Sequence, residues 1–541
     1  GGVNLFGRRI NARFRRFPRP TRTLPSAMNN IVAPEMEWEL LAGRMRSAAG
    51  EAFGAGDRPL NLMLGAWGVP GTPRLVTSPV DGRELGEIPM LDGPVARKAV
   101  AFAAAEALPW ARSGLDARRA RVALCLEQLR LHRDLLARLL VWEIGKPLKQ
   151  AETDVDRCIS GVEWYLDEAE TMMEGRTPLG LVSNIASWNY PFSVLMHSVL
   201  VQALAGNSVI AKTPTDGGAF SLTLGFALAR RAGLPVSLVS GSGGALSDAL
   251  VRAPEVDCVA FVGGRSSGRQ VAAGVVDQHR RHMLEMEGVN AYGVWEFSDW
   301  NALADQLHKG FDYGKQRCTA YARYVVQRRL LPAFLEMYLP VLRRIRVGNP
   351  VAVAAPGDAL PELDFGPLIN AAQVQSLREL TDGATAAGAL PLFAAELPDG
   401  RFIDGQDRSA YQMPMALLAP PRSCALYHRE PFGPVDTIVV VDRPEELVAE
   451  MNVSNGSLVG SLACDDTELG NELLGQVRAF KTGLNRVRSR GDRDEIFGGI
   501  GESWKGAFVG GRYLVDAVTR GPEGERLFGN FPEYTRQPEQ R

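Results

Sequence analysis

The order of apolar and polar positions divides the chain into a helical first part and a later part in which strands alternate with helices. Residues 36–56 and the Ala/Leu/Arg-rich stretch from Val95 to about Tyr165 are predicted to be helical, with short strands and turns at 62–90 between them. From Leu179 the hydrophobic pattern changes, and apolar runs of strand length alternate with helical stretches. The runs are GLVSNI, SVIAK, VSLVS and CVAFVGG, and the predicted helices start at about Pro191 and lie near 218–232, 245–252 and 266–274. Such repeated units predict a parallel, doubly wound sheet.

A second series of the same kind occupies residues 320–480. Its candidate strands are ARYVVQ (322–327), TIVVV (437–441) and GSLACD (460–465). The length of 541 residues also favours more than one domain. The sequence therefore predicts two α/β domains.

Composition and charge exclude several function classes. The chain is 45% hydrophobic and 23% charged with a net charge of -2, so no strong field favours nucleic acid or an anionic membrane. No apolar run reaches the roughly 18 residues of a membrane span, and the stretch 193–205 is predicted to be a buried helix. The six cysteines form no CxxC pair, which favours reduced thiols in a cytoplasmic protein. The six histidines have no metal-ligand spacing, so no metal site is predicted.

Short motifs are weak one by one. The turns SGSGG (240–244) and FVGGRSSG (261–268) each follow a predicted strand and open a predicted helix, where backbone amides can hold a phosphate. Neither is GxGxxG, so on its own each is explained more simply as a tight turn. Cys318, within GKQRCTAYARYVV (314–326), fits either a nucleophile or a small buried residue.

Taken in order, the motifs resemble one family. They are SWNYP (187–191), NSVIAKTP (207–214), FVGG (261–264), LEMEG (284–288), QRCTA (316–320), EPFGPV (430–435) and FGGIGES (497–503). Their order and approximate spacing resemble the NAD(P)-dependent aldehyde dehydrogenase superfamily over roughly residues 60–520. The resemblance implies an α/β fold with two doubly wound, Rossmann-like domains and an oligomerisation arm.

The resemblance also implies a domain organisation. Residues 28–285 would form a cofactor-binding domain and 286–482 a catalytic domain, while 483–541 would return to the first domain and supply a terminal oligomerisation strand and a tail. Residues 1–27 are Arg-rich and contain no acid, so we expect them to be a leader or a disordered segment. A transit peptide fits them, but an expression leader or upstream read-through before Met28 is the simpler interpretation.

The chemistry implied by the resemblance requires a nucleophile, an oxyanion donor and a base. Cys318 matches the family nucleophile, and we expect nearby cations such as Arg317 to favour its thiolate. Asn189 matches the side-chain donor that works with the backbone N–H of Cys318. Glu285 matches the general base that activates water to cleave a thioester. Taken alone, these three residues would be a structural cysteine, a turn asparagine and a solvated glutamate.

Cofactor contacts follow from the same resemblance, which implies NAD or NADP. Lys212 matches the lysine at the adenosine ribose, Glu430 the carboxylate at the nicotinamide ribose, and Phe432 the aromatic ring beside it. The remaining expected cofactor contacts are Trp188, Thr215 and the turn glycines Gly241, Gly263 and Gly264.

The sequence departs from the family pattern in four places. Thr215 stands where an acid often grips the ribose diol, which makes NADP plausible. EMEGV (285–289) replaces ELGGK, so Glu287 either raises the pKa of the Glu285 base or points away from it. FVGG replaces Thr-Gly-Ser, a mild change. The strand hairpin before PLG looks trimmed near 166–180, although FVGGRYLVDAVTR (508–520) offers a terminal strand, so a homodimer is expected.

The substrate is expected to be a small-molecule aldehyde, and its side chain is poorly specified. Arg317 and Thr319 flank the nucleophile, and the resemblance places Tyr190 and His197 along the substrate path. Arg317 fits either a substrate carboxylate or a structural ion pair. Oxidation of an aldehyde to a carboxylate is the leading function. The alternatives are acyl transfer to coenzyme A and a non-catalytic binding protein on this fold.

Overall fold

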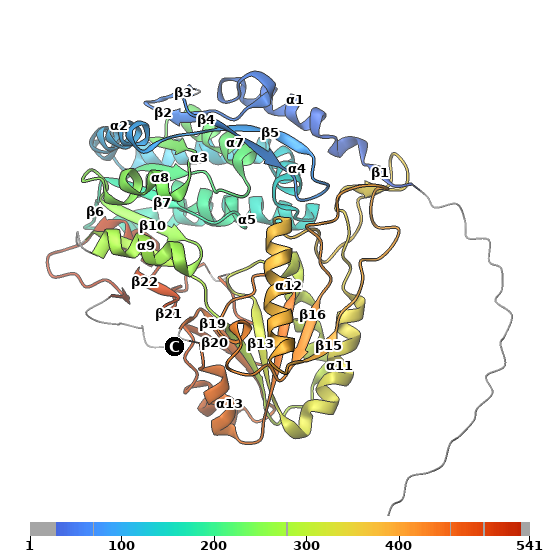
Figure 1. Ribbon diagram of the computed structural model, residues 1–541. Helices are drawn as coiled ribbons and strands as arrows, with labels where there is room; N and C mark the ends of the chain where they lie inside the picture. The colour runs from blue at the N-terminus through green and yellow to red at the C-terminus, as the bar shows by residue number, and fades with distance from the viewer. Residues whose placement is uncertain (1–28, 69, 277–279, 455, 491–492, 532–541) are drawn as a thin grey trace, which may run out of the picture.

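The computed structural model describes residues 29–68, 70–276, 280–454, 456–490 and 493–531, so the predicted leader 1–27 lies outside it (Figure 1). These residues form two α/β units, one at the top and one at the bottom of the view. The predicted fold class is confirmed. The domain boundaries stay a prediction. The chain passes from the first sheet to the second between Glu285 and Asn290.

The first unit is built on a nine-stranded sheet within the described residues. In spatial order the strands are β24 (Gly529–Asn530), β22 (Trp504–Ala507), β11 (Arg281–Glu285), β10 (Cys258–Val262), β7 (Leu181–Ile185), β8 (Ser208–Lys212), β9 (Val236–Val239), β2 (Asn61–Met63) and β3 (Ala66–Gly68). The five central strands are parallel and the outer ones antiparallel. The carboxyl ends of the central strands therefore share one edge, where ligand sites of doubly wound sheets form.

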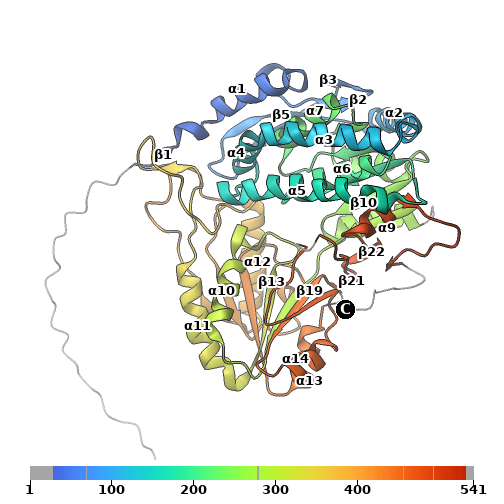
Figure 2. The same ribbon diagram turned by 180° about the vertical axis from the view of Figure 1, so that it is seen from behind.

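Helices cover both faces of this sheet because its central strands are apolar on both sides. In β8, Ile210 packs with α2 (Gly93–Arg112) and α9 (Arg265–Val276), whereas Val209 and Ala211 pack with the opposite core. The helices of that opposite face are α3 (Leu115–Leu131), α4 (Arg133–Ile144), α5 (Leu148–Met173), α6 (His197–Leu204) and α7 (Ala219–Arg231) (Figure 2). The long helical stretch predicted at 95–165 is thus four helices.

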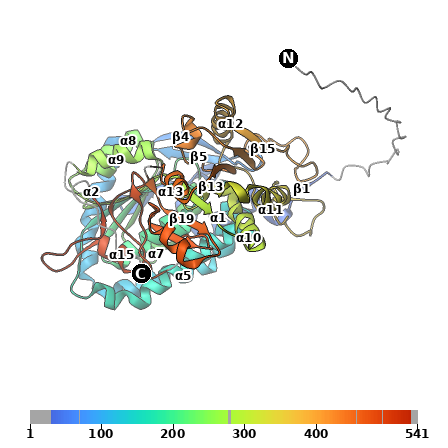
Figure 3. The same ribbon diagram turned by 90° about the horizontal axis from the view of Figure 1, so that it is seen from below.

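The second unit is built on a seven-stranded sheet. Its order is β15 (Leu390–Phe393), β16 (Met415–Leu418), β17 (Val435–Val441), β13 (Tyr321–Gln327), β12 (Asn290–Val294), β19 (Val459–Ala463) and β20 (Lys481–Leu484), with only β15 antiparallel to its neighbour among these described strands. Its helices are α10 (Trp300–Gly310), α11 (Leu331–Arg344), α12 (Ala371–Ala386), α13 (Pro444–Met451) and α14 (Thr467–Leu474). Helices α10 and α11 lie side by side (Figure 3).

The remaining elements flank the two units. At the start of the chain lie α1 (Trp38–Ala49) and the antiparallel pair of β4 (Thr72–Thr77) and β5 (Glu84–Met90). Two small ladders join β1 (Ile31–Val32) to β14 (Ala352–Val353) and β18 (Gly456–Ser457) to β21 (Ile500–Gly501). None of the helices in the described part is both long and apolar enough to cross a membrane.

The expected arm is reduced to one short ladder. Strand β6 (Thr177–Pro178) pairs with β23 (Thr519–Arg520) over two residues each. The expectation that 508–520 form a terminal strand is largely wrong, because most of this segment is the helix α15 (Arg512–Ala517) and its flanking turns. The chain then folds back along its own sheet, where β24 pairs with β22.

Candidate active site

Cys318 sits in a turn that two buried polar side chains hold in place. The Lys315 ammonium donates to the Tyr321 carbonyl at 2.9 Å and to the Asp436 carboxylate at 2.5 Å. From the start of β12, the Asn290 amide donates to the carbonyls of Cys318 and Ala320, each at 2.8 Å. The other five cysteines are buried, whereas Cys318 is partly exposed. The sequence interpretation missed Asn290, whose only signal was its place directly after EMEGV.

The thiol of Cys318 is held in its protonated form. Desolvation raises its pKa well above the ordinary value, and the facing Glu285 carboxylate raises it further. The cation that opposes this shift is Arg490. The expectation that Arg317 favours the thiolate is wrong, because its guanidinium donates to the Gly310 carbonyl at 2.6 Å.

Asn189 reaches the nucleophile segment from the first unit. It follows β7 and is 6% exposed, and its amide nitrogen donates to the Gln316 carbonyl at 3.1 Å. An amide carries two donor hydrogens, so this bond leaves one for another acceptor. Among the described residues, none accepts from the backbone N–H of Cys318. Two donors at this turn are thus available to a developing oxyanion.

Glu285 ends β11 at the junction of the two units. It is 2% exposed, and neither carboxylate oxygen has a hydrogen-bond partner within the described structure. One oxygen lies 3.3 Å from the Arg490 guanidinium, which also stacks over the Phe497 ring at 4.5 Å. A buried carboxylate without hydrogen bonds is costly unless a ligand or water uses it, which suits a general base. Sequence reasoning missed Arg490, because the pair joins distant segments.

Glu287 turns toward the start of α9. Its carboxylate accepts from the Arg265 N–H at 3.3 Å, the first residue of that helix. Its charge acts on Glu430, whose pKa is raised well above the ordinary value by burial first and then by Glu287 and Glu285. From the sequence, Glu287 is expected either to raise the pKa of Glu285 or to point away from it. The structure favours the second, because the Glu287 carboxylate bonds to the start of α9.

Lys212 ends β8 with its ammonium buried. It donates to the Thr213 carbonyl at 3.0 Å and to the Thr215 hydroxyl at 3.2 Å. Burial, and secondarily the charge of Arg74, lowers its pKa to about 8, while Asp216 acts in the opposite direction. A buried cation surrounded by hydroxyl and carbonyl groups can serve ribose hydroxyls or a phosphate.

Of the other expected cofactor residues, Trp188 and the turn glycines follow strands of the first sheet, whereas Phe432 precedes β17 of the second sheet. Trp188 packs edge-on against Phe432 with ring centroids 5.8 Å apart. A Cβ on Gly241 would stand 2.6 Å from Leu246, and one on Gly263 would stand 2.7 Å from the Phe261 ring. A Cβ on Gly264 would meet no atom within 4 Å, so crowding does not require glycine there.

The expected substrate residues differ in their surroundings. The Lys146 ammonium lies 3.9 Å from the centre of the Tyr190 ring, and the charge of Arg317 also acts on Tyr190. His197 packs against the Tyr165 ring with centroids 5.5 Å apart. Burial, with Arg490 and Arg493, lowers the pKa of His197 to about 4, so the ring is neutral. Thr319 is partly exposed beside Cys318.

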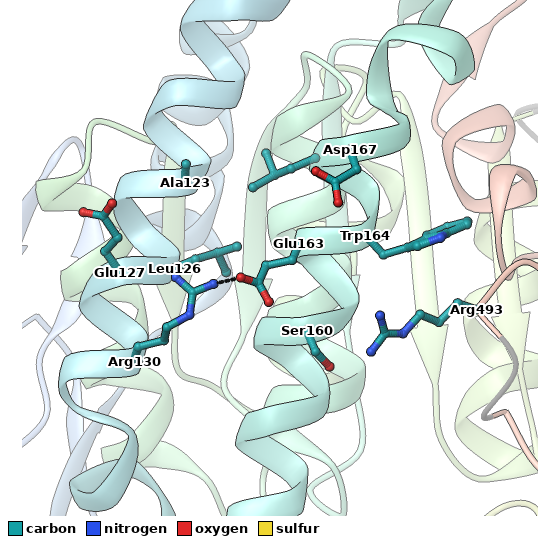
Figure 4. A pocket seen from close by; sticks show the side chains of 10 residues that line it. Ala123, Leu126, Glu127, Arg130, Ser160, Glu163, Trp164, Asp167 and Arg493 are labelled. Carbon is teal, nitrogen blue, oxygen red and sulfur yellow. Dashed lines mark hydrogen bonds and ion pairs between the residues drawn. The ribbon is translucent and has the colours of Figure 1, made fainter.

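A groove of about 490 Å³ lies outside this constellation, between α3 and α5 (Figure 4). Arg130 on α3 pairs with Glu163 on α5, and Trp164 and Arg493 line the groove on the other side. None of the expected site residues lines it. Its Arg493 lies in the same segment as Arg490.

The chain is similar to known proteins in sequence and in fold. The model of the aldehyde dehydrogenase family matches residues 70–521. The chain is 26% identical to 3,6-anhydro-alpha-L-galactose dehydrogenase of Vibrio sp. (strain EJY3), covering 76% of this chain and 87% of the relative. It is 25% identical to glutarate-semialdehyde dehydrogenase of Pseudomonas putida, covering 82% and 92%.

A solved structure shows the same fold. The NADP-dependent glyceraldehyde-3-phosphate dehydrogenase of Bacillus halodurans C-125, complexed with NADP, superposes with a TM-score of 0.76 at 24% identity, covering 85% of this chain and 97% of that one. The chain therefore belongs to the aldehyde dehydrogenase family and is an oxidoreductase that oxidises aldehydes to acids with NAD or NADP.

Proposed function

We propose that Cys318, Asn189 and Glu285 carry out this oxidation. The Cys318 thiol gives up its proton to solvent, the resulting thiolate attacks the aldehyde carbon, and the Asn189 amide and the Cys318 N–H stabilise the oxyanion. After oxidation the substrate is a thioester on Cys318. Glu285 accepts a proton from water, the water oxygen bonds the acyl carbon, and the C–S bond breaks to return the thiolate. The observation that carries the proposal is the Glu285 carboxylate of one unit facing the Cys318 thiol of the other.

The expected cofactor residues of the two units fit a nicotinamide dinucleotide. Lys212 presents a buried cation without a carboxylate bonded to it, and the turns at Gly241 and Gly263 bring backbone where a side chain would clash. Trp188 and Phe432 form an apolar wall, and Glu430 offers a carboxylate for ribose hydroxyls. When bound, NAD(P)+ supplies the hydride acceptor.

NADP is the cofactor that Lys212 and Thr215 favour, and its affinity should depend on pH. Because the pKa of Lys212 is about 8, its ammonium loses its proton between pH 7 and 9. We expect the Kd for NADP+ to rise roughly tenfold over that interval, since a 2′-phosphate loses its cation. Fluorescence titration at several pH values measures this. A flat profile in Lys212→Met is the control, and an equally flat profile in the unmodified protein would contradict the assignment.

Glu287 is expected to weaken cofactor binding. Its carboxylate occupies the first amide of α9, a place that favours a phosphate. We expect Glu287→Gly to lower the Kd for NADP+ by about three- to thirtyfold, the range of charge effects at helix N-termini. Isothermal titration calorimetry measures the change, and Glu287→Asp, which keeps the charge, is the matched control. An unchanged or higher Kd in Glu287→Gly would show that the carboxylate does not compete with the cofactor.

The formation of reduced cofactor tests the proposed function. NAD+ and NADP+ are offered separately with short aliphatic, long aliphatic, aromatic and carboxylate-bearing aldehydes. We expect turnover that requires Cys318, that is faster with NADP+, and that does not depend on added coenzyme A. Turnover that survives removal of the Cys318 thiol, or that requires coenzyme A, would contradict the proposal.

The assembly and the cellular location are also proposals. We infer a homodimer, supported by the short β6–β23 ladder that remains of the arm. We infer a cytoplasmic location, supported by six cysteines that form no disulfide. Light scattering during gel filtration tests the homodimer, and a mass other than twice that of one chain would contradict it. A reporter fusion imaged in cells tests the cytoplasmic location, and signal outside the cytoplasm would contradict it.

A further inference from the structure

In the free protein Glu285, the base of the proposed mechanism, is paired with a cation. Within the described structure, Arg490 is the one side chain at ion-pair distance from Glu285, and the carboxylate has no hydrogen bond of its own. Removing a carboxylate from water is costly without such a partner. The same guanidinium approaches Oε2, one of the two atoms of Glu285 that can accept a proton from water. Arg490 therefore stabilises Glu285 and obstructs it.

The surroundings of Arg490 allow its guanidinium to change from one anionic partner to another. It lies in the segment after β20, and its side chain is 32% exposed. Its guanidinium rests on the Phe497 ring, a contact that leaves donor hydrogens free for another anion. Its charge acts on the Cys318 thiol and on His197, so it lies near both the proposed nucleophile and a residue expected along the substrate path.

We propose that Arg490 is a latch on Glu285, which means that it holds the base in an ion pair until the carboxylate of an acidic aldehyde replaces Glu285 as its partner. This inference rests on the proposed function and names its substrate class. When the acidic substrate binds, the guanidinium transfers its ion pair from Glu285 to the substrate carboxylate. Glu285 is then free to accept a proton from water during thioester cleavage. A neutral aldehyde offers no replacement anion, so separating Arg490 from Glu285 is uncompensated. Arg490 thus acts as a positioning residue on the base and as a specificity residue for the substrate.

Two substrates that differ only in charge test the latch. One is a five-carbon aldehyde with a terminal carboxylate and the other is its methyl ester. In the unmodified protein we expect kcat/KM for the acid to exceed that for the ester by about 10- to 100-fold, because one hydrogen bond to a charged group contributes an effect of this size. In Arg490→Leu we expect the KM for the acid to rise by a similar factor, while kcat for the ester stays equal or rises. Arg490→Lys should restore part of the preference for the acid.

The controls separate the latch from a structural role and from the proposed function. Arg493→Leu removes a nearby cation that does not pair with Glu285, and it should leave the ratio of acid to ester unchanged. An equal fall of kcat for both substrates in Arg490→Leu would reveal a merely structural role. Cys318-dependent turnover with equal preference for acid and ester in the unmodified protein would overturn the latch alone. No turnover of any aldehyde would overturn the proposed function and the latch together.

Discussion

Replacing Cys318 by alanine is expected to abolish aldehyde oxidation, with kcat lower by at least about 10⁴-fold. The physical reason is that the adduct which leads to a thioester needs a thiolate, and Cys318 is the one thiol in the described residues of this turn. Asn189 and the backbone N–H are donors, and Glu285 is separated from bulk water. Reduced-cofactor absorbance with a carboxylate-bearing aldehyde measures the effect. The Kd for NADP+ should change little, because Lys212 and the α9 turn are untouched.

Cys424→Ala is the matched control for this substitution. It also removes one thiol, but Cys424 is buried among apolar residues of the second unit. We expect it to retain turnover. Comparable residual activity in Cys318→Ala and Cys424→Ala would mean that Cys318 is not the nucleophile.

Replacing Glu285 by glutamine is expected to separate the two halves of the reaction. Steady-state turnover should fall by about 10²- to 10⁴-fold, the usual contribution of a general base. A burst of reduced cofactor close to one per active site should remain, because the first half needs only the thiolate and the oxyanion donors. Stopped-flow absorbance measures both quantities. If the burst of reduced cofactor fell by the same factor as steady-state turnover, Glu285 would act in the first half of the reaction, before the thioester forms.

The same variant makes a second prediction with the opposite sign. The charge of Glu285 raises the pKa of the Cys318 thiol, so removing that charge should lower the pKa and increase the thiolate fraction at neutral pH. Alkylation of Cys318 by iodoacetamide at pH 7 should therefore be faster in Glu285→Gln than in the unmodified protein. Slower or equal alkylation would show that the carboxylate does not govern the thiol.

The sequence predicted the parts of the fold that depend on local pattern. Runs such as SVIAK and ARYVVQ are apolar on both faces, and they became the central strands β8 and β13. The arm was less predictable, because 508–520 is apolar enough for a strand. Gly510 and Gly511 instead take positive φ values, and a short helix follows them. Local hydrophobicity could not distinguish these outcomes.

The candidate site shows a similar limit. The order of motifs singled out Cys318, Asn189 and Glu285 as the candidate site, but it could not give the directions of the side chains. Arg317 is adjacent to Cys318 in sequence, yet the cation that acts on the thiol is Arg490. Glu287 is two residues from the proposed base, and an extended strand would place both side chains on one face, but β11 ends at Glu285 and the Glu287 carboxylate bonds to the start of α9.

The most direct test of the central claim is peptide mass spectrometry of Glu285→Gln after mixing with NADP+ and a carboxylate-bearing aldehyde. The account predicts a stable acyl group on the peptide that contains Cys318, at close to one per chain, and none in the double variant that also lacks the thiol. An acyl group on another cysteine, or full turnover with no acyl group on Cys318, would contradict the assignment of the nucleophile and its base.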